Sequence, residues 1–235
     1  MDYQDDNESP GPYDFRFPGQ MRGVLFAPSG GGKTTFMVNF ILNGDELLKN
    51  PFKQVLFYYW NYQPLYELLR EKLKNDIVFI QGEPNLDELT AILTEAEDPL
   101  LLVFDDFTQH LTKDIATIYT RLSHHYNCHV LLSLHNFFSK SPHARDITQS
   151  ANALVLFKNP RDMTFANTLG GQIMPHRHTV FTDIYQRATE KIYGYLFVNL
   201  HQETPEPLRY VSNIFPNELP IRVFKCKKKK SHGSN

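Results

Sequence analysis

The sequence predicts an α/β fold in which helices cover both faces of a mostly parallel central sheet. Two observations support this prediction. Short runs of apolar, β-branched or aromatic residues recur along the chain, with gaps between them that are long enough for helices. The runs are apolar almost throughout instead of alternating with polar residues, which is typical of strands that are buried on both faces. Strands that alternate with helices in this way form parallel sheets through right-handed crossovers.

Six of these runs are expected to form the parallel strands, at residues 22–27, 54–60, 77–80, 100–105, 129–134 and 153–157. Helices are expected at residues 33–43, 64–74, 85–97 and 113–126, and near residues 162–173. Asn85 stands at an N-cap position, three residues before Glu88. Two later strands, at 193–200 and 208–215, are expected to form a C-terminal antiparallel β-hairpin around a Pro-containing turn.

One domain is predicted, from residue 15 to residue 220, with a polar tail at each end. The chain has 235 residues, of which 41% are hydrophobic and 21% are charged, and this is an ordinary composition for a globular protein. Residues 1–14 are acidic and interrupted by Pro and Gly, whereas residues 221–235 carry the basic run KCKKKK. Both tails are therefore expected to be flexible.

Charge and composition limit the classes of partner. The formal net charge is −2, so any contact with nucleic acid must come from local basic patches. No apolar run approaches the ~20 residues that a membrane helix needs, and no membrane partner is expected. The two cysteines, Cys128 and Cys226, form no CxxC pattern and favour a reducing, intracellular compartment.

The stretch APSGGGKT, residues 27–34, fits the phosphate-loop pattern and lies between a predicted strand and a predicted helix, as that motif requires. Its glycines allow several backbone N–H groups to point at one phosphate, and the positive end of the helix adds to the field. We expect Lys33 to reach the β- and γ-phosphates of ATP and the Thr34 hydroxyl to hold Mg²⁺. The stretch expected to bind the cofactor comprises Pro28, Ser29, Gly30, Gly31, Gly32, Lys33, Thr34 and Thr35, with Thr35 as a helix residue and not a second metal ligand.

Two adjacent carboxylates, Asp105 and Asp106, end the apolar run LLLVF. Acids at the end of a buried strand are costly to bury unless a cation is near, and Mg²⁺ held by Thr34 would supply one. We assign Asp105 to the metal, through water, and Asp106 to polarisation of the attacking water. The alternative is that the pair caps the segment near Thr108.

The strand predicted at 54–60 lies between the phosphate loop and the acidic strand in the sequence. This favours the ATPase branch of phosphate-loop NTPases (ASCE, RecA-like), in which a further strand separates those two in the sheet. It fits nucleotide kinases less well.

Polar residues also follow the next two predicted strands. His135 and Asn136 stand at the carboxyl end of the strand 129–134, the edge where ligands bind in open α/β sheets, and either can contact the γ-phosphate or the attacking water. The alternative for this pair is loop capping.

Arg145 and Arg161 lie beyond strand ends, and an arginine delivered to a neighbouring subunit's γ-phosphate accelerates hydrolysis ~10³–10⁵-fold. The alternative for each arginine is a surface ion pair.

Taken in order, the segments APSGGGKTT, LLVFDD, SLHNFF and ARDITQSANALVLFKNPRD resemble the poxvirus-type genome-packaging ATPases of the FtsK–HerA superfamily. The versions carried by Maverick/Polinton-like elements and related eukaryotic DNA viruses are especially similar. The similarity runs from about residue 20 to residue 175. The first two segments are general to NTPases, and the specific part is the sensor strand followed by the FKNPRD strand.

The resemblance implies a homo-oligomeric ring, a pentamer or hexamer, that uses ATP and Mg²⁺ to translocate double-stranded DNA into a capsid, with capsid or portal proteins as further partners. The residues matched are the loop pair, the acidic pair and the polar sensor: Lys33, Thr34, Asp105, Asp106 and Asn136. His135 stands where Gln is usual in the family. The resemblance also favours Arg145 over Arg161 as the arginine finger, the arginine that acts on a neighbouring subunit's γ-phosphate.

Two other functions remain open at this point: a phosphate-loop nucleotide or nucleoside kinase, and a nucleotide-bound assembly factor that does not hydrolyse ATP. The basic run Lys225–Lys230 has three interpretations, namely a nuclear-import signal, a DNA-contacting tail, or a solvated run of charge. The expected location is inside the host cell, with the nucleus and the virion as the two specific alternatives.

Overall fold

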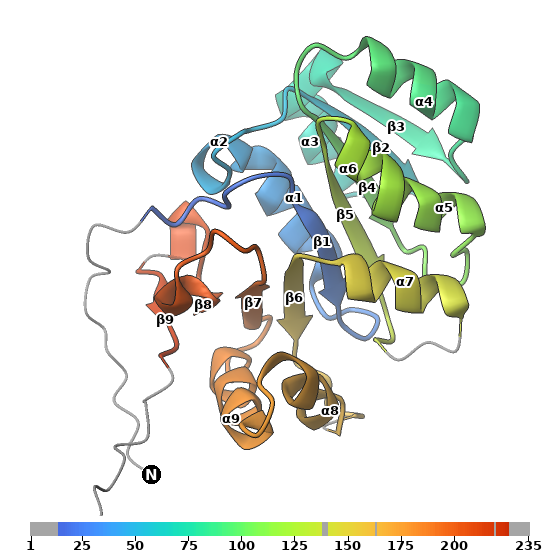
Figure 1. Ribbon diagram of the computed structural model, residues 1–235. Coiled ribbons are helices and arrows are strands. Elements are labelled where there is room, and N and C mark those ends of the chain that lie inside the picture. The colour runs from blue at the N-terminus through green and yellow to red at the C-terminus, as the bar shows by residue number, and fades with distance from the viewer. Residues whose placement is uncertain (1–13, 138–140, 163, 219, 226–235) are drawn as a thin grey trace, which may run out of the picture.

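The parallel sheet predicted from the sequence forms the centre of the molecule. The computed structural model describes residues 14–137, 141–162, 164–218 and 220–225. Over these ranges the chain builds a nine-stranded sheet in the order β3-β2-β4-β5-β1-β6-β7-β8-β9 (Figure 1). The strands are β1 (Arg22–Phe26), β2 (Gln54–Tyr59), β3 (Ile77–Gln81), β4 (Leu100–Asp105), β5 (Cys128–Leu134), β6 (Ala153–Phe157), β7 (Tyr195–Asn199), β8 (Tyr210–Ser212) and β9 (Arg222–Val223).

The pairing within the sheet changes from parallel to antiparallel at β6. All five pairings among β1 to β6 are parallel, as predicted. β7 pairs antiparallel with β6, and β8 and β9 continue in the same way. The predicted C-terminal hairpin is therefore present as β7 and β8, but it is joined to the main sheet. β9 lies beyond residue 220, so the sheet includes residues on the far side of the predicted domain boundary.

Helices cover both faces of the sheet (Figure 1). Alternate residues of a strand point to opposite faces, and in β4 Leu101 and Val103 pack with α1 and α3 while Leu102 and Phe104 pack with the helices of the other face. The helices are α1 (Lys33–Leu42), α2 (Gly44–Leu47), α3 (Tyr66–Leu73), α4 (Leu86–Glu95), α5 (Lys113–Thr117), α6 (Ser123–His125), α7 (Pro142–Ser150), α8 (Thr164–Ile173) and α9 (His178–Ala188).

Several helices differ from their predictions. Asn85 caps α4 as expected, because its side chain accepts hydrogen bonds from the N–H groups of Asp87 and Glu88. The helix predicted at 113–126 is interrupted by a π-helical segment, Ile118–Leu122, between α5 and α6. α2, α7 and α9 were not predicted from the sequence.

The predictions for the two tails concern residues that lie largely outside the described ranges. Of the acidic segment 1–14 the structure describes Asp14, and of the basic run it describes Lys225. Within the described ranges, no helix combines the length and the apolar character needed to cross a membrane.

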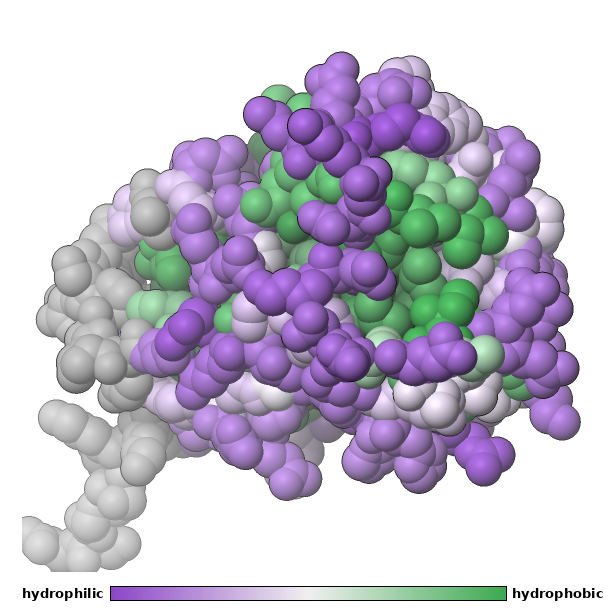
Figure 2. All heavy atoms as spheres, turned by 90° about the horizontal axis from the view of Figure 1, so that it is seen from above, coloured by the Kyte–Doolittle hydropathy of each residue, from purple (hydrophilic) through white to green (hydrophobic). Residues whose placement is uncertain are grey.

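The two ends of the sheet differ in surface character. The parallel strands β1, β5 and β6 run downward in Figure 1, so their carboxyl ends point away from the face that Figure 2 shows from above. On that upper face, hydrophobic residues form an area bordered by hydrophilic ones (Figure 2). α3, β3 and α4 lie at the β3 edge of the sheet, toward the top of Figure 1, and each carries an exposed hydrophobic residue, namely Leu68, Val78 and Ile92. The polar side chains predicted to form the site gather instead at the carboxyl ends of β1, β4 and β5.

Candidate active site

The carboxyl ends of β4, β5 and β1 bring the predicted site residues together. These strands are neighbours in the order β4-β5-β1, so β5 separates the acidic strand from the strand of the phosphate loop. That is the separation expected for the ATPase branch. A hollow of about 300 Å³ opens where the strands end. It is lined by Ser29, Gly30, Gly31, Gly32, Lys33, Thr34, Thr35, Gln63, Asp105, Asp106, His135 and Tyr193, and we call it the phosphate hollow.

The loop between β1 and α1 is shaped by its glycines. Gly32, the N-cap residue of α1, has φ +98°, a left-handed conformation that favours glycine. A Cβ atom on Gly31 would lie 2.6 Å from the Cβ of Ala27, so a side chain there does not fit. No side chain caps the start of α1, and its first turn contains no acid. The first N–H groups of α1 are thus left for an anion, as in other helix-terminal phosphate sites.

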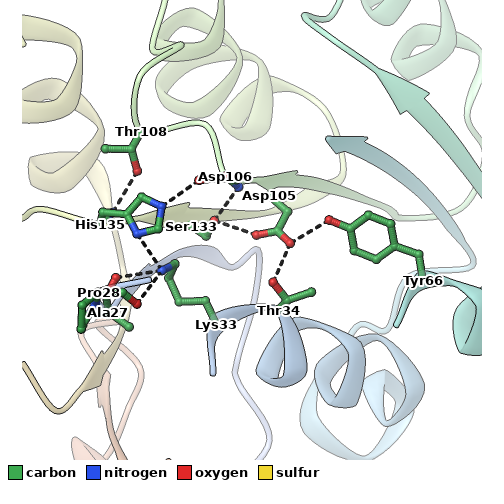
Figure 3. Close-up of polar contacts among 10 residues, drawn as sticks. All are labelled: Ala27, Pro28, Lys33, Thr34, Tyr66, Asp105, Asp106, Thr108, Ser133 and His135. Carbon is green, nitrogen blue, oxygen red and sulfur yellow. Dashed lines mark hydrogen bonds and ion pairs between the residues drawn. The ribbon is translucent and has the colours of Figure 1, made fainter. Parts of the chain in front are cut away.

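Lys33 is folded back into the loop. It is 7% exposed, and its Nζ donates to the carbonyl oxygens of Ala27 at 2.8 Å and Pro28 at 3.2 Å (Figure 3). Burial lowers the pKa of Lys33 to about 8, and the charges of Asp105 and Asp106 oppose this shift. An anion placed in the hollow would favour the charged lysine, so the buried ammonium is suited to a phosphate group.

His135 connects Lys33 with Asp106. Its Nδ1 lies 3.0 Å from Lys33 Nζ, and its Nε2 lies 2.7 Å from Asp106 Oδ1 (Figure 3). An ammonium group can only donate, so Nδ1 must accept, and the proton of the neutral ring is on Nε2, from which it is donated to the carboxylate. The backbone N–H of His135 donates to Thr108 Oγ1 at 2.9 Å, which fixes the end of β5. The three side chains form one continuous chain of hydrogen bonds.

Asp105 is the buried acid of the pair. It is 2% exposed, and its carboxylate accepts from three hydroxyl groups (Figure 3). Thr34 Oγ1 donates to Oδ2 at 2.8 Å, Tyr66 Oη donates to Oδ2 at 2.9 Å, and Ser133 Oγ donates to Oδ1 at 2.9 Å. Burial, followed by the charge of Asp105, raises the pKa of Tyr66, so Tyr66 stays a donor. The three hydrogen bonds satisfy the hydrogen-bonding capacity of this buried carboxylate and hold it directly beside Thr34.

Asp106 is the accessible acid of the pair. Its side chain is 45% exposed, in contrast to that of Asp105. Its backbone has φ +64°, and its N–H donates to Ser133 Oγ at 2.8 Å. Asp and Asn adopt this left-handed conformation more readily than other residues with side chains. The turn aims the carboxylate at His135 and leaves it open to water.

The remaining predicted residues lie farther from the phosphate hollow. Asn136 is exposed and lines a different, smaller hollow together with Phe137 and Asn159. The structure thus brings His135, and not Asn136, into the phosphate hollow. Arg145, on α7, and Arg161, after β6, are both exposed and line none of the hollow. Their predicted roles therefore depend on a second copy of the chain.

Three residues that hold the site together were not predicted from the sequence: Tyr66, Thr108 in this role, and Ser133. Tyr66 is 39 residues from the carboxylate that it contacts, and it resembles an ordinary core residue of α3. Ser133 gave a weak signal, because it is a polar residue in an otherwise apolar strand end. Its hydroxyl links both acids, since it donates to Asp105 and accepts from Asp106.

Two viral packaging proteins of known structure share this fold. The genome packaging NTPase of Sulfolobus turreted icosahedral virus 2, in complex with sulfate, matches with a TM-score of 0.54 and 13% identity, over 91% of this chain and 99% of that one. The DNA-packaging ATPase of Sulfolobus turreted icosahedral virus matches with a TM-score of 0.53 and 12% identity, over 92% and 100%. The first protein also matches in its complex with ATP-γ-S, at 0.50 and 13%, over 91% and 98%.

At these identities the comparison shows the fold, and it confirms the predicted mostly parallel phosphate-loop architecture. The structural neighbours are of the kind that the sequence resemblance indicated. No family model matches the sequence. No curated protein matches it either.

Proposed function

We propose that this chain is a motor ATPase that hydrolyses ATP and drives double-stranded DNA into a viral capsid as part of a homo-oligomeric ring. The observation that carries the proposal is the linked set of Lys33, His135 and Asp106 beside the phosphate loop, which joins a phosphate-binding cation to an accessible acid. The fold shared with two viral packaging enzymes supports the DNA-packaging part. The order of motifs along the sequence supports it independently.

In this proposal each residue acts on a defined part of the nucleotide. Lys33 leaves the carbonyls of Ala27 and Pro28 and pairs with the β- and γ-phosphates. His135 then loses its hydrogen-bond partner at Nδ1. Asp106 accepts the proton of the attacking water, because it is the acid open to solvent. The hydrogen bond between His135 and Asp106 would in this way depend on whether Lys33 holds a phosphate.

The residues also suit a magnesium ion. Mg²⁺ prefers hard oxygen ligands, and it usually keeps several waters beside one or two carboxylates and the phosphates. Thr34 Oγ1 and Asp105 Oδ2 lie 2.8 Å apart at the edge of the phosphate hollow, so the donor set fits. Bound there, the ion would neutralise charge on the phosphate oxygens. Tyr66 and Ser133 would keep the Asp105 carboxylate in place for it.

A kinase and an ATP-bound assembly factor are the competing functions. The separation of β1 from β4 by β5 favours the ATPase over a nucleotide kinase. The complete set of loop lysine, loop threonine and paired acids favours turnover over passive binding. Each competing function corresponds to a distinct outcome of the following test.

We expect ATP hydrolysis by the full-length chain to be stimulated by double-stranded DNA, and the stimulation to decrease as salt increases. The physical reason is that contacts between lysine or arginine and DNA phosphates release counterions, so the affinity falls with salt. The measurement is phosphate release with and without DNA at two salt concentrations, beside Lys33→Ala. The Lys33→Ala chain is expected to lose nucleotide binding and all hydrolysis.

Three other results would redirect the assignment. Hydrolysis that DNA does not change would weaken the DNA-motor proposal and keep the ATPase. Phosphate transfer to a nucleoside or nucleotide would identify a kinase. Binding of ATP without any turnover, with and without DNA, would identify an assembly factor.

The affinity for ATP is expected to fall as the pH rises above about 8. The pKa of Lys33 is lowered to about 8 by burial in the ligand-free protein, and the bound phosphates favour its charged form. Above this pH the lysine is neutral before ATP arrives, so binding must take up a proton, and the affinity falls by up to about tenfold per pH unit. Calorimetry at rising pH, in two buffers with different ionisation enthalpies, measures the proton uptake. An affinity that stays constant from about pH 7.5 to pH 9.5, with no proton uptake, would contradict this account of Lys33.

A further inference from the structure

A second hollow adjoins the phosphate hollow. It has a volume of about 260 Å³ and shares Gly32, Thr35 and Tyr193 with its neighbour. The two hollows therefore meet at the start of α1, where the phosphates of a bound nucleotide would lie. The full lining of the second hollow is Gly32, Thr35, Phe36, Asn39, Phe157, Tyr193, Tyr195, Phe215 and Glu218, and we call it the aromatic hollow.

Aromatic residues make up most of the lining of the aromatic hollow. Phe36 of α1 contacts Tyr195 and Phe215 edge to face, each with ring centroids 5.0 Å apart, and Phe157 at 6.1 Å. These four rings are buried in the core below the surface of the hollow. Asn39 and Glu218 add an amide and a carboxylate to the lining. A flat heterocycle with polar edges fits such a site, because the lining combines aromatic rings with hydrogen-bonding groups.

Tyr193 stands at the junction of the two hollows. It belongs to the connection between α9 and β7, and it is 68% exposed, which is unusual for a large aromatic residue. Its backbone is left-handed, with φ +60°. Such a conformation is strained for a bulky residue, and it persists where the surrounding structure imposes it.

The surroundings of Tyr193 fix the strained turn beside the phosphate loop. The N–H of Gly194 donates to Lys191 O at 2.9 Å, and a Cβ on Gly194 would lie 2.8 Å from Ala188 O. On the other side, a Cβ on Gly32 would lie 3.3 Å from the Tyr193 ring. The ring is thus held against the phosphate loop while most of the residue remains open to solvent.

We infer that the aromatic hollow receives the base of the bound nucleotide and that Tyr193 is the residue on which the base stacks. The inference rests on the proposed function, because it requires a nucleotide in the phosphate hollow. When the phosphates are bound by the N–H groups after Gly32, the sugar and base can extend either into solvent or into the aromatic hollow. In the aromatic hollow the base can stack on an aromatic ring. Stacking of a base on an aromatic side chain contributes about 1–3 kcal/mol, which corresponds to about 5- to 150-fold in affinity.

The test compares a ligand that has a base with a ligand that has none. Calorimetry on the full-length chain measures the binding of ATP and of inorganic tripolyphosphate to the wild type and to Tyr193→Ala, Tyr193→Phe and Ile192→Ala. Ile192 is the matched control, since it is the neighbouring residue, is 87% exposed and lines neither hollow. Thermal melting of each variant establishes that it is folded.

Tyr193→Ala is expected to weaken ATP binding about 5- to 150-fold and to leave tripolyphosphate binding unchanged. Tyr193→Phe and Ile192→Ala should both bind ATP like the wild type. Three results would overturn the inference: an unchanged ATP affinity in Tyr193→Ala, an equal loss for both ligands, which would assign Tyr193 to the support of Gly32, or an equal loss in Ile192→Ala. In each of these three results the wild type still binds ATP, so the result does not count against the proposed function. If the wild type binds neither ligand, the proposed function fails together with the inference.

Discussion

An Asp106→Asn chain is expected to bind ATP like the wild type and to hydrolyse it about 10²–10⁴-fold more slowly. The substitution removes the carboxylate that we propose as the proton acceptor for the attacking water. It changes little else, because Asn is also tolerated at φ +64° and its amide oxygen can still accept from His135 Nε2. The backbone N–H at this position, which donates to Ser133 Oγ, is retained. Single-turnover hydrolysis and nucleotide calorimetry on the same preparation measure the two quantities.

The control for charge alone is Asp114→Asn, which changes an exposed acid in the first turn of α5 that does not line the phosphate hollow. This variant should hydrolyse ATP at the wild-type rate. An Asp106→Asn chain with an unchanged rate would exclude Asp106 as the proton acceptor. A loss of ATP binding in that chain would instead indicate a role in shaping the site.

The second large effect is expected for Arg145→Ala, which should lower the hydrolysis rate of the assembled ring about 10³–10⁵-fold. Arg145 is exposed on α7 and lines none of the phosphate hollow of its own chain. We therefore propose that it acts on the γ-phosphate bound by a neighbouring subunit. The slow hydrolysis of the isolated chain should remain unchanged, so the rate must be measured as a function of protein concentration, with DNA present.

A mixing experiment tests whether the arginine acts on a neighbour. Lys33→Ala chains cannot bind ATP but still supply Arg145, whereas Arg145→Ala chains bind ATP but supply no arginine. Mixed rings should recover part of the activity that neither variant shows alone. Arg161→Ala is the matched variant, because Arg161 is also exposed and follows β6, the next strand along the chain. Full activity in Arg145→Ala together with loss in Arg161→Ala would reverse the assignment.

Most of the parallel sheet was predictable from the sequence, for a clear physical reason. Strands covered on both faces are almost entirely apolar, and β4 and β5 have every residue buried. The same reasoning failed for α7, where only Ala144 and Ile147 are buried in a largely polar segment. α9 was missed although Phe181, Ile184, Tyr185 and Ala188 recur at helical spacing and are buried.

The site was predictable where a motif carries the chemistry, and not where distant residues support it. The loop residues from Ser29 to Thr35 and the two acids follow patterns of contiguous residues, and the structure places them around one hollow. The hydroxyls of Tyr66 and Ser133 meet Asp105 only because α3 and β5 are packed beside the end of β4. The sequence did not separate His135 from Asn136, since both follow the same strand, and in the structure His135 lines the phosphate hollow whereas Asn136 lines only the smaller one.

The left-handed backbone of Asp106 has a consequence for the evolution of this position. At φ +64° the turn accepts glycine, asparagine or aspartate with little strain and disfavours nearly every other residue. An aspartate retained at this position among relatives would indicate two selective pressures, one for the left-handed backbone conformation and one for the reaction. Loss of the reaction alone would be expected to leave asparagine or glycine behind. The identity of this one residue in a divergent relative would thus separate a degenerate enzyme from a working one.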